Sequence, residues 1–350
     1  MPVTVIIGGQ FGSEGKGKVS HFFARESKAD IAIRVGGPNS GHTVIDRFGN
    51  PIILKQLPTP SLLPNVMCVI GPGSYIDPDL LLEEIKRVNL PLARLIIDPN
   101  AVIITKAELE KEKESLLKAN IGSTQSGTGA AVMARISRNS NIKFAKSEPR
   151  LKSFVDSTAP FLRKCINEGK RIIIEGTQGF GLSLLHSDFY PFVTSRDTSA
   201  ASFVSEVGLS PLDVDEIIMV LRAFPIRVSG NSGPLPNEIN WDIVTEESGN
   251  VTPIIEYTSV TKKIRRVAYF DPEVVRKAIL VNRPTQIVLN HVDYIDSTCK
   301  SESRITDKAS SFICNIENMI EASIDFIGIS PTTVISTIES YSINTSRKIA

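Results

Sequence analysis

Short hydrophobic runs recur along the chain, and several of them are continuous rather than alternating. They are residues 3–7, 31–35, 66–70, 95–97, 171–174, 216–221, 286–289 and 324–327. Continuous runs are typical of strands that are buried on both faces of a parallel sheet. The pattern therefore predicts an α/β fold in which helices flank a mostly parallel central sheet, as a single large domain over residues 1–350.

Amphipathic segments between these runs predict helices over residues 80–88, 105–119, 272–281 and 312–320. Pro78 and Pro272 each follow an aspartate, and proline is favoured in the first turn of a helix because its φ angle is already helical. In the charged second segment, Glu114 and Lys118 are spaced as an i,i+4 ion pair. Polar, turn-rich residues predict surface loops over 231–237 and 297–311.

Composition narrows the class of protein. The 39 basic and 38 acidic residues leave a net charge of +1, which gives no reason to expect binding to nucleic acid or to a membrane. The apolar runs are far shorter than a membrane span, and Met1-Pro2 leads straight into a strand with no signal peptide. The four cysteines lack a zinc-binding spacing. We therefore expect a cytoplasmic protein with free thiols.

A glycine-rich stretch directly after the first strand predicts a phosphate-binding loop: Gly8-Gly9-Gln10-Phe11-Gly12-Ser13-Glu14-Gly15-Lys16-Gly17-Lys18. Glycines let backbone N–H groups approach an anion, and the N-terminus of the following helix adds a favourable dipole. Lys16 supplies a positive charge for the phosphates. The loop is not a Walker A motif, because Gly9 and Gly15 enclose five residues and Lys16 is followed by Gly17.

Further polar clusters lie at residues 36–43, 123–129, 175–181, 190–195, 258–267 and 290–293. Histidine titrates near neutral pH, so His42 is suited to donate a proton to a developing oxyanion. Arginine holds carboxylates bidentately, which suits Arg265 to binding a carboxylate. Each cluster by itself is equally consistent with a solvent-exposed loop that binds no ligand. Together with the first loop, the clusters favour a nucleotide-binding site.

Together the clusters resemble the adenylosuccinate synthetases, in order from residue 6 to about 331. The first loop is similar to that family's Gly-Gln-Trp-Gly-Asp-Glu-Gly-Lys-Gly-Lys, and residues 36–43 to its Gly-Gly-His-Asn-Ala-Gly-His-Thr. Residues 175–179 and 190–195 resemble Glu-Gly-Ala-Gln-Gly and Tyr-Pro-Tyr-Val-Thr-Ser at the family's spacing. Residues 258–267 resemble its aspartate-binding loop, and residues 290–293 its base-reading Thr-Lys-x-Asp.

The resemblance implies a role for each matching residue. The resemblance implies that the catalytic residues are Ser13, Lys16 and His42, and that His42 is the acid at the purine O6. It also implies that Mg²⁺ is bound by Ser13 and the Gly41 carbonyl. Aspartate is assigned to Val260, Thr261, Lys263 and Arg265. The nucleotides are assigned to Gly12, Ser13, Glu14, Gly15, Lys16, Gly17, Asn39, Gly41, His42, Thr43, Ser123, Thr124, Gln125, Arg138, Gln178, Thr194, Asn290, Asp293 and Gly328. A phosphate-binding arginine that reaches across to a second subunit, matched by Arg135 or Arg138, implies a homodimer.

Several positions depart from the family. Ser13 replaces an aspartate that takes a proton from the purine N1 and binds Mg²⁺, and a hydroxyl is no general base near neutral pH without an activating partner. His291 replaces the lysine that packs against the donor base, which argues against GTP and allows ATP or dATP. Lys263 replaces an arginine near the ribose, which suggests the hypothesis that it affects sugar preference.

A phage branch of the family, the 2-aminoadenylosuccinate synthetases, carries serine at the position of Ser13. A serine beside N1 leaves room for the 2-amino group of guanine and keeps a small donor and acceptor there. The resemblance therefore implies a ligase that uses ATP or dATP to join L-aspartate to C6 of dGMP, for the synthesis of DNA containing 2-aminoadenine. The alternatives are a conventional adenylosuccinate synthetase, which uses IMP and GTP, and an inactive nucleotide-binding family member. Glu14, a Mg²⁺-bound water and a substrate phosphate are all candidates for the missing base.

Overall fold

A nine-stranded sheet with the strand order β17-β16-β15-β11-β1-β10-β2-β5-β7 forms the centre of the molecule, in a computed structural model that describes residues 3–258 and 263–337. Neighbouring strands are parallel except for β16 and β17. The strands are β1 (Val3–Gly8), β2 (Ile31–Arg34), β5 (Met67–Ile70), β7 (Leu95–Ile97), β10 (Ile172–Glu175), β11 (Val214–Arg222), β15 (Gln286–Asn290), β16 (Phe326–Gly328) and β17 (Val334–Ser336). Every predicted run forms a strand of this sheet, and the predicted α/β fold is confirmed.

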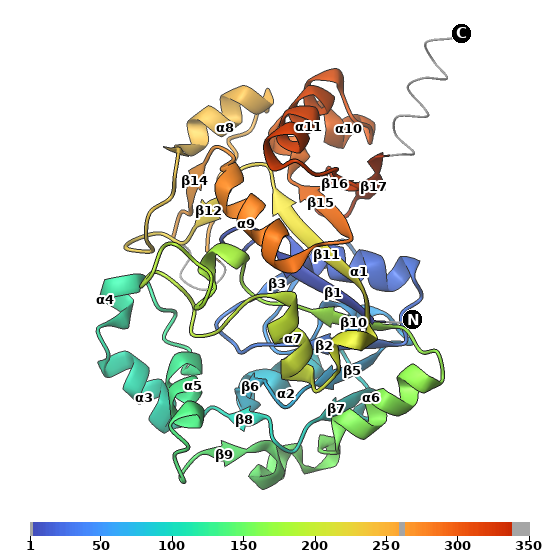
Figure 1. Ribbon diagram of the computed structural model, residues 1–350, viewed down its shortest axis with the longest axis vertical. Helices are drawn as coiled ribbons and strands as arrows, with labels where there is room; N and C mark the ends of the chain where they lie inside the picture. The colour runs from blue at the N-terminus through green and yellow to red at the C-terminus, as the bar shows by residue number, and fades with distance from the viewer. Residues whose placement is uncertain (1–2, 259–262, 338–350) are drawn as a thin grey trace.

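Helices cover both faces of the sheet (Figure 1). Helix α1 (Lys16–Glu26) packs on one face, where its Val19 shares a hydrophobic cluster with Ile6 of β1. The other face, with Val5 of β1, is covered by α6 (Thr158–Asn167), α7 (Ala200–Val207), α9 (Pro272–Asn282) and α11 (Asp307–Ile320). Successive side chains of a strand point to opposite faces, so a strand covered on both sides is hydrophobic throughout.

The remaining elements surround this core. Short strands form three small sheets: β3 (His42–Ile45) with β4 (Pro51–Leu54); β6 (Tyr75–Ile76), β8 (Val102–Ile103) and β9 (Lys143–Phe144); and β12 (Ile226–Arg227), β13 (Glu238–Ile239) and β14 (Arg266–Ala268). The other helices are α2 (Pro78–Arg87), α3 (Lys106–Glu114), α4 (Leu117–Ile121), α5 (Thr128–Ile136), α8 (Trp241–Ser248) and α10 (Thr298–Glu302). Figure 1 shows α8, α10 and α11 together at the top and α3, α4 and α5 at the lower left.

Two sequence predictions of secondary structure were wrong. Residues 105–119 form α3 and α4 instead of one helix, because Ser115 adopts an extended conformation that ends α3. Residues 297–311 are not one loop, since they contain α10 and the first turn of α11, where the Thr306 hydroxyl caps the helix by accepting from the Ala309 N–H at 3.2 Å. Helices α2 and α9 confirm the predicted starts at the two prolines. No helix in the described part of the chain is long and apolar enough to cross a membrane.

Candidate active site

The candidate site lies at the carboxyl ends of five adjacent parallel strands, β15, β11, β1, β10 and β2. These strands end at Asn290, Arg222, Gly8, Glu175 and Arg34. Ligands of open α/β sheets bind at this edge, outside the ends of the strands. Sequence reasoning assigned no role to Arg222, Glu175 or Arg34. The signal in the sequence that could have identified these three residues is a charged side chain at the end of a buried apolar run.

The loop after β1 turns at Gly12 (φ 88°), Ser13 (φ 58°) and Gly15 (φ 93°), and α1 begins at Lys16. The predicted order of strand, glycine-rich loop and helix is therefore present. The Glu14 carboxylate is buried inside the loop, where it accepts a hydrogen bond from the Gly12 N–H at 2.8 Å. Its second oxygen lies 2.6 Å from the buried Lys16 Nζ. Glu14 and Lys16 thus pair with each other.

The loop after β10 packs directly on this first loop. A Cβ added to Gly179 would lie 2.3 Å from Glu14 Oε1 and 2.4 Å from the Gly12 nitrogen, so only glycine fits there. Gln178, the preceding residue, is half-buried and has a positive φ of 59°. Thr194 is also half-buried, in the segment that follows. The structure therefore brings Gln178 to the phosphate loop, as the predicted nucleotide site requires.

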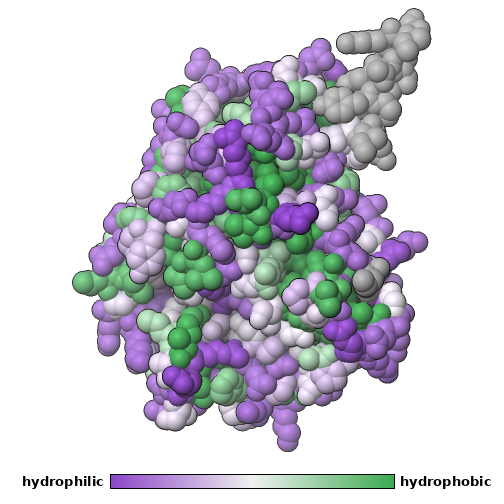
Figure 2. Space-filling view, in the orientation of Figure 1, coloured by the Kyte–Doolittle hydropathy of each residue, from purple (hydrophilic) through white to green (hydrophobic). Residues whose placement is uncertain are grey.

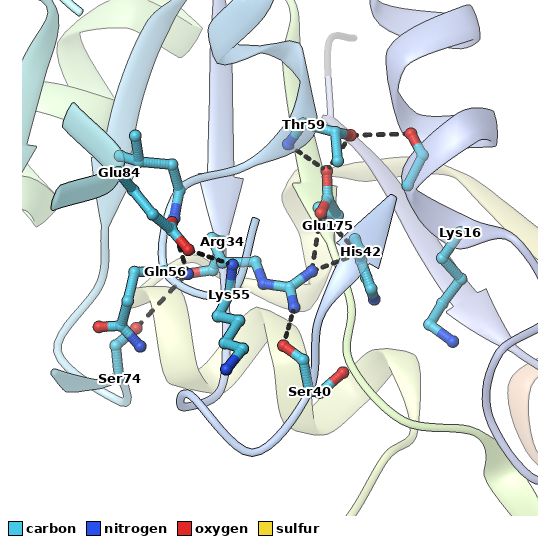
Figure 3. A network of polar contacts seen from close by, with 12 residues as sticks. Lys16, Arg34, Ser40, His42, Lys55, Gln56, Thr59, Ser74, Glu84 and Glu175 are labelled. Carbon is cyan, nitrogen blue, oxygen red and sulfur yellow. Dashed lines mark hydrogen bonds and ion pairs between the residues drawn. The ribbon is translucent and has the colours of Figure 1, made fainter. Parts of the chain in front are cut away.

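His42 lies at the start of β3 and is buried against β10 (Figure 3). Its Nδ1 lies 2.6 Å from Glu175 Oε1, and Arg34 Nη1 lies 2.7 Å from the same oxygen. Thr59 donates to the other carboxylate oxygen from its backbone N–H at 2.8 Å and its hydroxyl at 2.6 Å. Figure 3 shows His42 between this group and Lys16.

The charges of this group follow from its burial. Burial and the nearby Arg34 lower the pKa of His42 to about 3. Burial disfavours the charge of Glu175, but hydrogen bonding and charge from His42 and Arg34 outweigh it and hold the carboxyl pKa at about 2. His42 Nε2 is buried and has no hydrogen-bond partner among the described residues. Buried nitrogens are normally paired, so this atom is available to a bound group.

Ser13 lies beside two arginines. Arg265 donates a hydrogen bond from Nη1 to the Ser13 hydroxyl, and Arg222 Nη1 donates to the Ser13 carbonyl at 3.1 Å. Glu256 forms an ion pair with Arg222 and lies 3.8 Å from Arg265 Nε. Burial disfavours the charge of Glu256, but the charge of Arg222 outweighs this effect and holds its pKa at about 2. The structure therefore brings the predicted aspartate-binding Arg265 to the first loop.

The rest of the predicted aspartate loop lies partly within the described residues. Lys263 is exposed, and its N–H donates to the Thr258 hydroxyl at 3.0 Å. Val260 and Thr261, both predicted to bind aspartate, lie outside the described residues. Their roles stay predictions.

Asn290 joins the first loop to the C-terminal strands. Its Nδ2 donates to the Glu14 carbonyl at 2.8 Å, and a Cβ on Gly328 would lie 1.9 Å from its Oδ1 and 2.4 Å from Lys18 Nζ. Burial lowers the pKa of Lys18 to about 8. Burial also raises the pKa of Asp293 to about 6, and the charge of Lys18 opposes that shift. The predicted donor-base residues Asn290, Asp293 and Gly328 are thus gathered around Lys18, which sequence reasoning did not select.

Ser123, Thr124 and Gln125 connect α4 to α5. The Gln125 N–H donates to the Ser123 hydroxyl at 3.2 Å, while Thr124 is exposed. Behind this loop, Glu112 of α3 accepts from the N–H groups of residues 127 and 129, at 2.8 and 2.6 Å. A buried carboxylate therefore caps the first turn of α5 and supports the loop from inside.

The other predicted residues lie at the rim. Asn39 and Gly41 are half-buried before β3, and Thr43 is exposed on that strand. Arg135 donates to the Pro72 carbonyl at 2.6 Å within its own chain, whereas Arg138 is exposed after α5. Arg138 is therefore better placed than Arg135 to reach a second molecule.

A parallel sheet with a phosphate loop, a buried histidine and paired arginines at its carboxyl edge defines a nucleotide-dependent enzyme. The chain belongs to the adenylosuccinate synthetase family, whose model matches residues 5–146 and 141–301. It is accordingly a C–N ligase acting on a purine nucleotide and aspartate. The family resemblance inferred from the sequence is confirmed.

The chain is similar to proteins from archaea, from a phage and from Plasmodium falciparum. The adenylosuccinate synthetase of Methanocaldococcus jannaschii is 38% identical over 342 residues, which are 95% of this chain and 93% of that protein. That of Archaeoglobus fulgidus is 35% identical over 337 residues, which are 95% of this chain and 96% of that protein. The succinoaminodeoxyadenylate synthetase of cyanophage S-2L, solved with dGMP and with dATP as energy donor, is 26% identical, with a TM-score of 0.82 over 99% of both chains. The fully ligated Plasmodium falciparum adenylosuccinate synthetase, 22% identical with a TM-score of 0.84 over 96% of this chain and 100% of that one, shares the fold.

Proposed function

We propose that this ligase joins L-aspartate to C6 of dGMP, with ATP or dATP as phosphoryl donor, through a 6-phosphoryl intermediate. The product is N6-succino-2-amino-2′-deoxyadenylate, a precursor of 2-aminoadenine nucleotides. The observation that carries the proposal is the exposed Ser13 hydroxyl at the tip of the phosphate loop, in contact with Arg265. The bound dGMP and dATP of the cyanophage S-2L relative support the same substrates.

Serine at this position changes both the size and the charge of the site. A carboxylate at position 13 would form an ion pair with Arg265, whereas the neutral hydroxyl makes only a hydrogen bond to it and leaves its charge less neutralised for a substrate carboxylate. The smaller side chain also leaves space beside the purine for the 2-amino group of guanine. Both effects favour an aspartate ligase that accepts a 2-amino purine.

Phosphoryl transfer depends mainly on positioning and charge stabilisation, which suits a site without a strong base. His42 is neutral near pH 7, because burial lowers its pKa to about 3. An anionic phosphoryl group beside Nε2 favours the protonated imidazole, which then stabilises negative charge at O6. Gln178 reads the purine edge, Arg265 holds aspartate, and the roles of Asn39, Thr124 and Thr194 at the acceptor nucleotide follow the family pattern.

Mg²⁺ fits this site as an ion held chiefly by substrate. The chain offers two neutral oxygens, the Ser13 hydroxyl and the Gly41 carbonyl, while the nearby Glu14 carboxylate is already paired with Lys16. Mg²⁺ keeps several waters and commonly binds through substrate phosphates, so a site poor in carboxylates is compatible with it. Bound there, the ion would neutralise the charge that develops on the transferred phosphoryl group.

Among the candidates for the missing base, Glu14 is the least suited. Its carboxylate is buried, accepts the Gly12 N–H and pairs with Lys16, so it faces the loop interior. A water on Mg²⁺ and a substrate phosphate therefore stay as the candidates.

A homodimer completes the proposal. Arg138 is exposed after α5, and apolar residues lie on the surface nearby. Ile136 and Leu185 are each 70% exposed, and both line one surface pocket with Leu184. The face of the molecule drawn in Figure 2 carries several hydrophobic patches among hydrophilic residues. In a dimer that covers them, the family pattern assigns Arg138 to the partner's acceptor phosphate.

The main alternative is a conventional adenylosuccinate synthetase that uses IMP and GTP. It is favoured by the names of the archaeal relatives, which are 35–38% identical and cover nearly the whole chain. An inactive nucleotide-binding protein is disfavoured, since His42 keeps its contact with Glu175 and Arg265 keeps its contact with Ser13.

A single assay separates these functions. The purified protein is incubated with aspartate, Mg²⁺ and ATP, dATP or GTP, with dGMP and IMP offered in parallel, and product masses are measured. The proposal predicts the succinylated product from dGMP with an adenine nucleotide as donor. Turnover of IMP alone would establish the conventional synthetase. Nucleotide binding without turnover would establish the inactive family member.

A further inference from the structure

Glu175 is a fully buried carboxylate whose surroundings are built around its charge. It ends β10, and in the sheet register its neighbour on β2 is Arg34. One oxygen faces Arg34 and His42, and the other receives the backbone N–H and the hydroxyl of Thr59. Both oxygens therefore have at least two donor contacts, and neither is left for substrate.

Two contacts of Nδ1 bear on which nitrogen of His42 carries the proton: a protonated Nδ1 suits Glu175, and a lone pair there suits Arg34. Arg34 Nη1 also contacts His42 Nδ1, but a guanidinium has only donors and an ionised carboxylate only accepts. A proton on Nδ1 is therefore directed to Glu175 Oε1, 2.6 Å away. The lone pair is then on Nε2, the buried atom without a partner among the described residues.

We propose that Glu175 is a positioning residue, which fixes the Nδ1–H tautomer and the ring orientation of His42 so that Nε2 faces the reacting phosphoryl group. The inference rests on the proposed function in that it takes the purine O6 and its phosphoryl group as the partner of Nε2. Arg34 balances the charge of Glu175, so His42 stays neutral until an anion enters. Thr59 links the carboxylate to the phosphate loop, because its hydroxyl also lies 2.8 Å from the Gly17 carbonyl.

The same region contains a matched control. Glu84 is also fully buried, and it accepts from the backbone N–H groups of Lys55, Gln56 and Leu57 at 2.6, 3.0 and 3.0 Å. Figure 3 shows it to the side of the His42 group, with Arg34 between them. Glu84 thus has the burial and the hydrogen bonds of a structural carboxylate without the contact to His42.

The first test needs no turnover. The chain has only four histidines, so the imidazole nitrogens of His42 can be assigned by NMR in a ¹⁵N-histidine-labelled sample with single substitutions of the others. We expect Nδ1 to be protonated and Nε2 to be unprotonated in the free protein at pH values within about one unit of neutrality. A proton on Nε2 in that state would overturn the proposal, whatever the substrate is.

The second test compares turnover, with whichever nucleotide the wild-type protein uses. Glu175→Gln should lower kcat by roughly 10- to 100-fold with KM nearly unchanged, as loss of orienting partners commonly does. Glu84→Gln should reduce stability and leave kcat within about threefold, because Glu84 contacts backbone N–H groups and Arg87 but not His42. Equal kcat losses in the two variants, or an unchanged kcat in Glu175→Gln, would show that Glu175 is merely structural.

Thr59 provides a milder pair of variants in case Glu175→Gln does not fold. Thr59→Val removes the hydroxyl bond to Glu175, and Thr59→Ser keeps it. We expect a lower kcat in the valine variant and recovery in the serine variant. Equal kcat values in both would count against the proposal. If the wild-type protein turns over no nucleotide, the proposed function fails, and the NMR experiment still decides the tautomer.

Discussion

Ser13 and Arg265 are 252 residues apart in the chain, and the Arg265 guanidinium donates a hydrogen bond to the Ser13 hydroxyl. The contact joins the tip of the phosphate loop to the predicted aspartate loop. It places the residue that departs from the family next to a group expected to hold the second substrate. Purine choice and aspartate binding are therefore expected to change together when Ser13 is altered.

Ser13→Asp should move the purine preference toward IMP. A carboxylate there restores a base for N1, pairs with Arg265 and crowds the 2-amino group. We expect the ratio of kcat/KM for dGMP to that for IMP to fall by about tenfold or more. Ser13→Asn is the control, since it has the size of aspartate without the charge. The same ratio in all three proteins would contradict the role given to Ser13.

Lys263→Arg tests the hypothesis on sugar preference. Lys263 is exposed and stands where the family has an arginine, so arginine should improve the use of a ribonucleotide relative to its deoxy form. The measurement is kcat/KM for GMP and dGMP. Lys152→Arg, at another exposed lysine, is the control. An unchanged preference in Lys263→Arg removes the idea.

Asp293 should make the protein less stable as the pH rises from about 4 to 6. Burial raises its pKa in the folded protein to about 6, above the ordinary 3.8. The folded state then binds more protons than the unfolded state in this window, so the free energy of unfolding falls with increasing pH. Asp293→Asn removes the buried charge. Its gain in Tm over the wild-type protein should be larger at pH 7.5 than at pH 4, and equal gains would refute the assignment.

Glu112→Ala should loosen the loop before α5. The Glu112 carboxylate accepts from the N–H groups of residues 127 and 129, and hydrogen bonds to a buried charge contribute about 2 kcal/mol. We expect that loss in the free energy of unfolding, together with a higher KM for the acceptor nucleotide. Glu114→Ala, at an exposed position of the same helix, should change neither. Chemical denaturation and initial-rate kinetics measure both effects.

Gly328→Ala should disturb the donor-base region. Its Cβ would lie 1.9 Å from Asn290 Oδ1 and 2.4 Å from Lys18 Nζ, and overpacking of this kind costs about 1–3 kcal/mol. KM for the phosphoryl donor should rise more than that for the acceptor nucleotide. Gly169 has a positive φ and open space around it, so Gly169→Ala is the control that measures the cost of a positive φ alone. Equal costs for the two substitutions would argue against close packing at Gly328.

Some elements could be predicted from the sequence because burial fixes the pattern of their residues, whereas others depend on the backbone conformation of a single residue. A strand buried on both faces has to be hydrophobic at every position, so the runs that became β1 and β10 were readable without a structure. The break between α3 and α4 was not readable, because Ser115 adopts an extended conformation within a sequence of good helix formers. Helix α11 starts earlier than predicted because the Thr306 cap is effective even in a Ser-rich segment.

The sequence by itself determined the parallel sheet, the phosphate loop and the family, because strand patterns and glycine spacings are local properties of the chain. It also identified Ser13, His42 and Arg265 as the residues to inspect. Only the tertiary structure decided their partners. Glu175 reaches His42 because β10 lies beside β2, and Arg265 reaches Ser13 across the molecule. Charge, tautomer and pKa depend on such distant neighbours, which spacing along a chain does not specify.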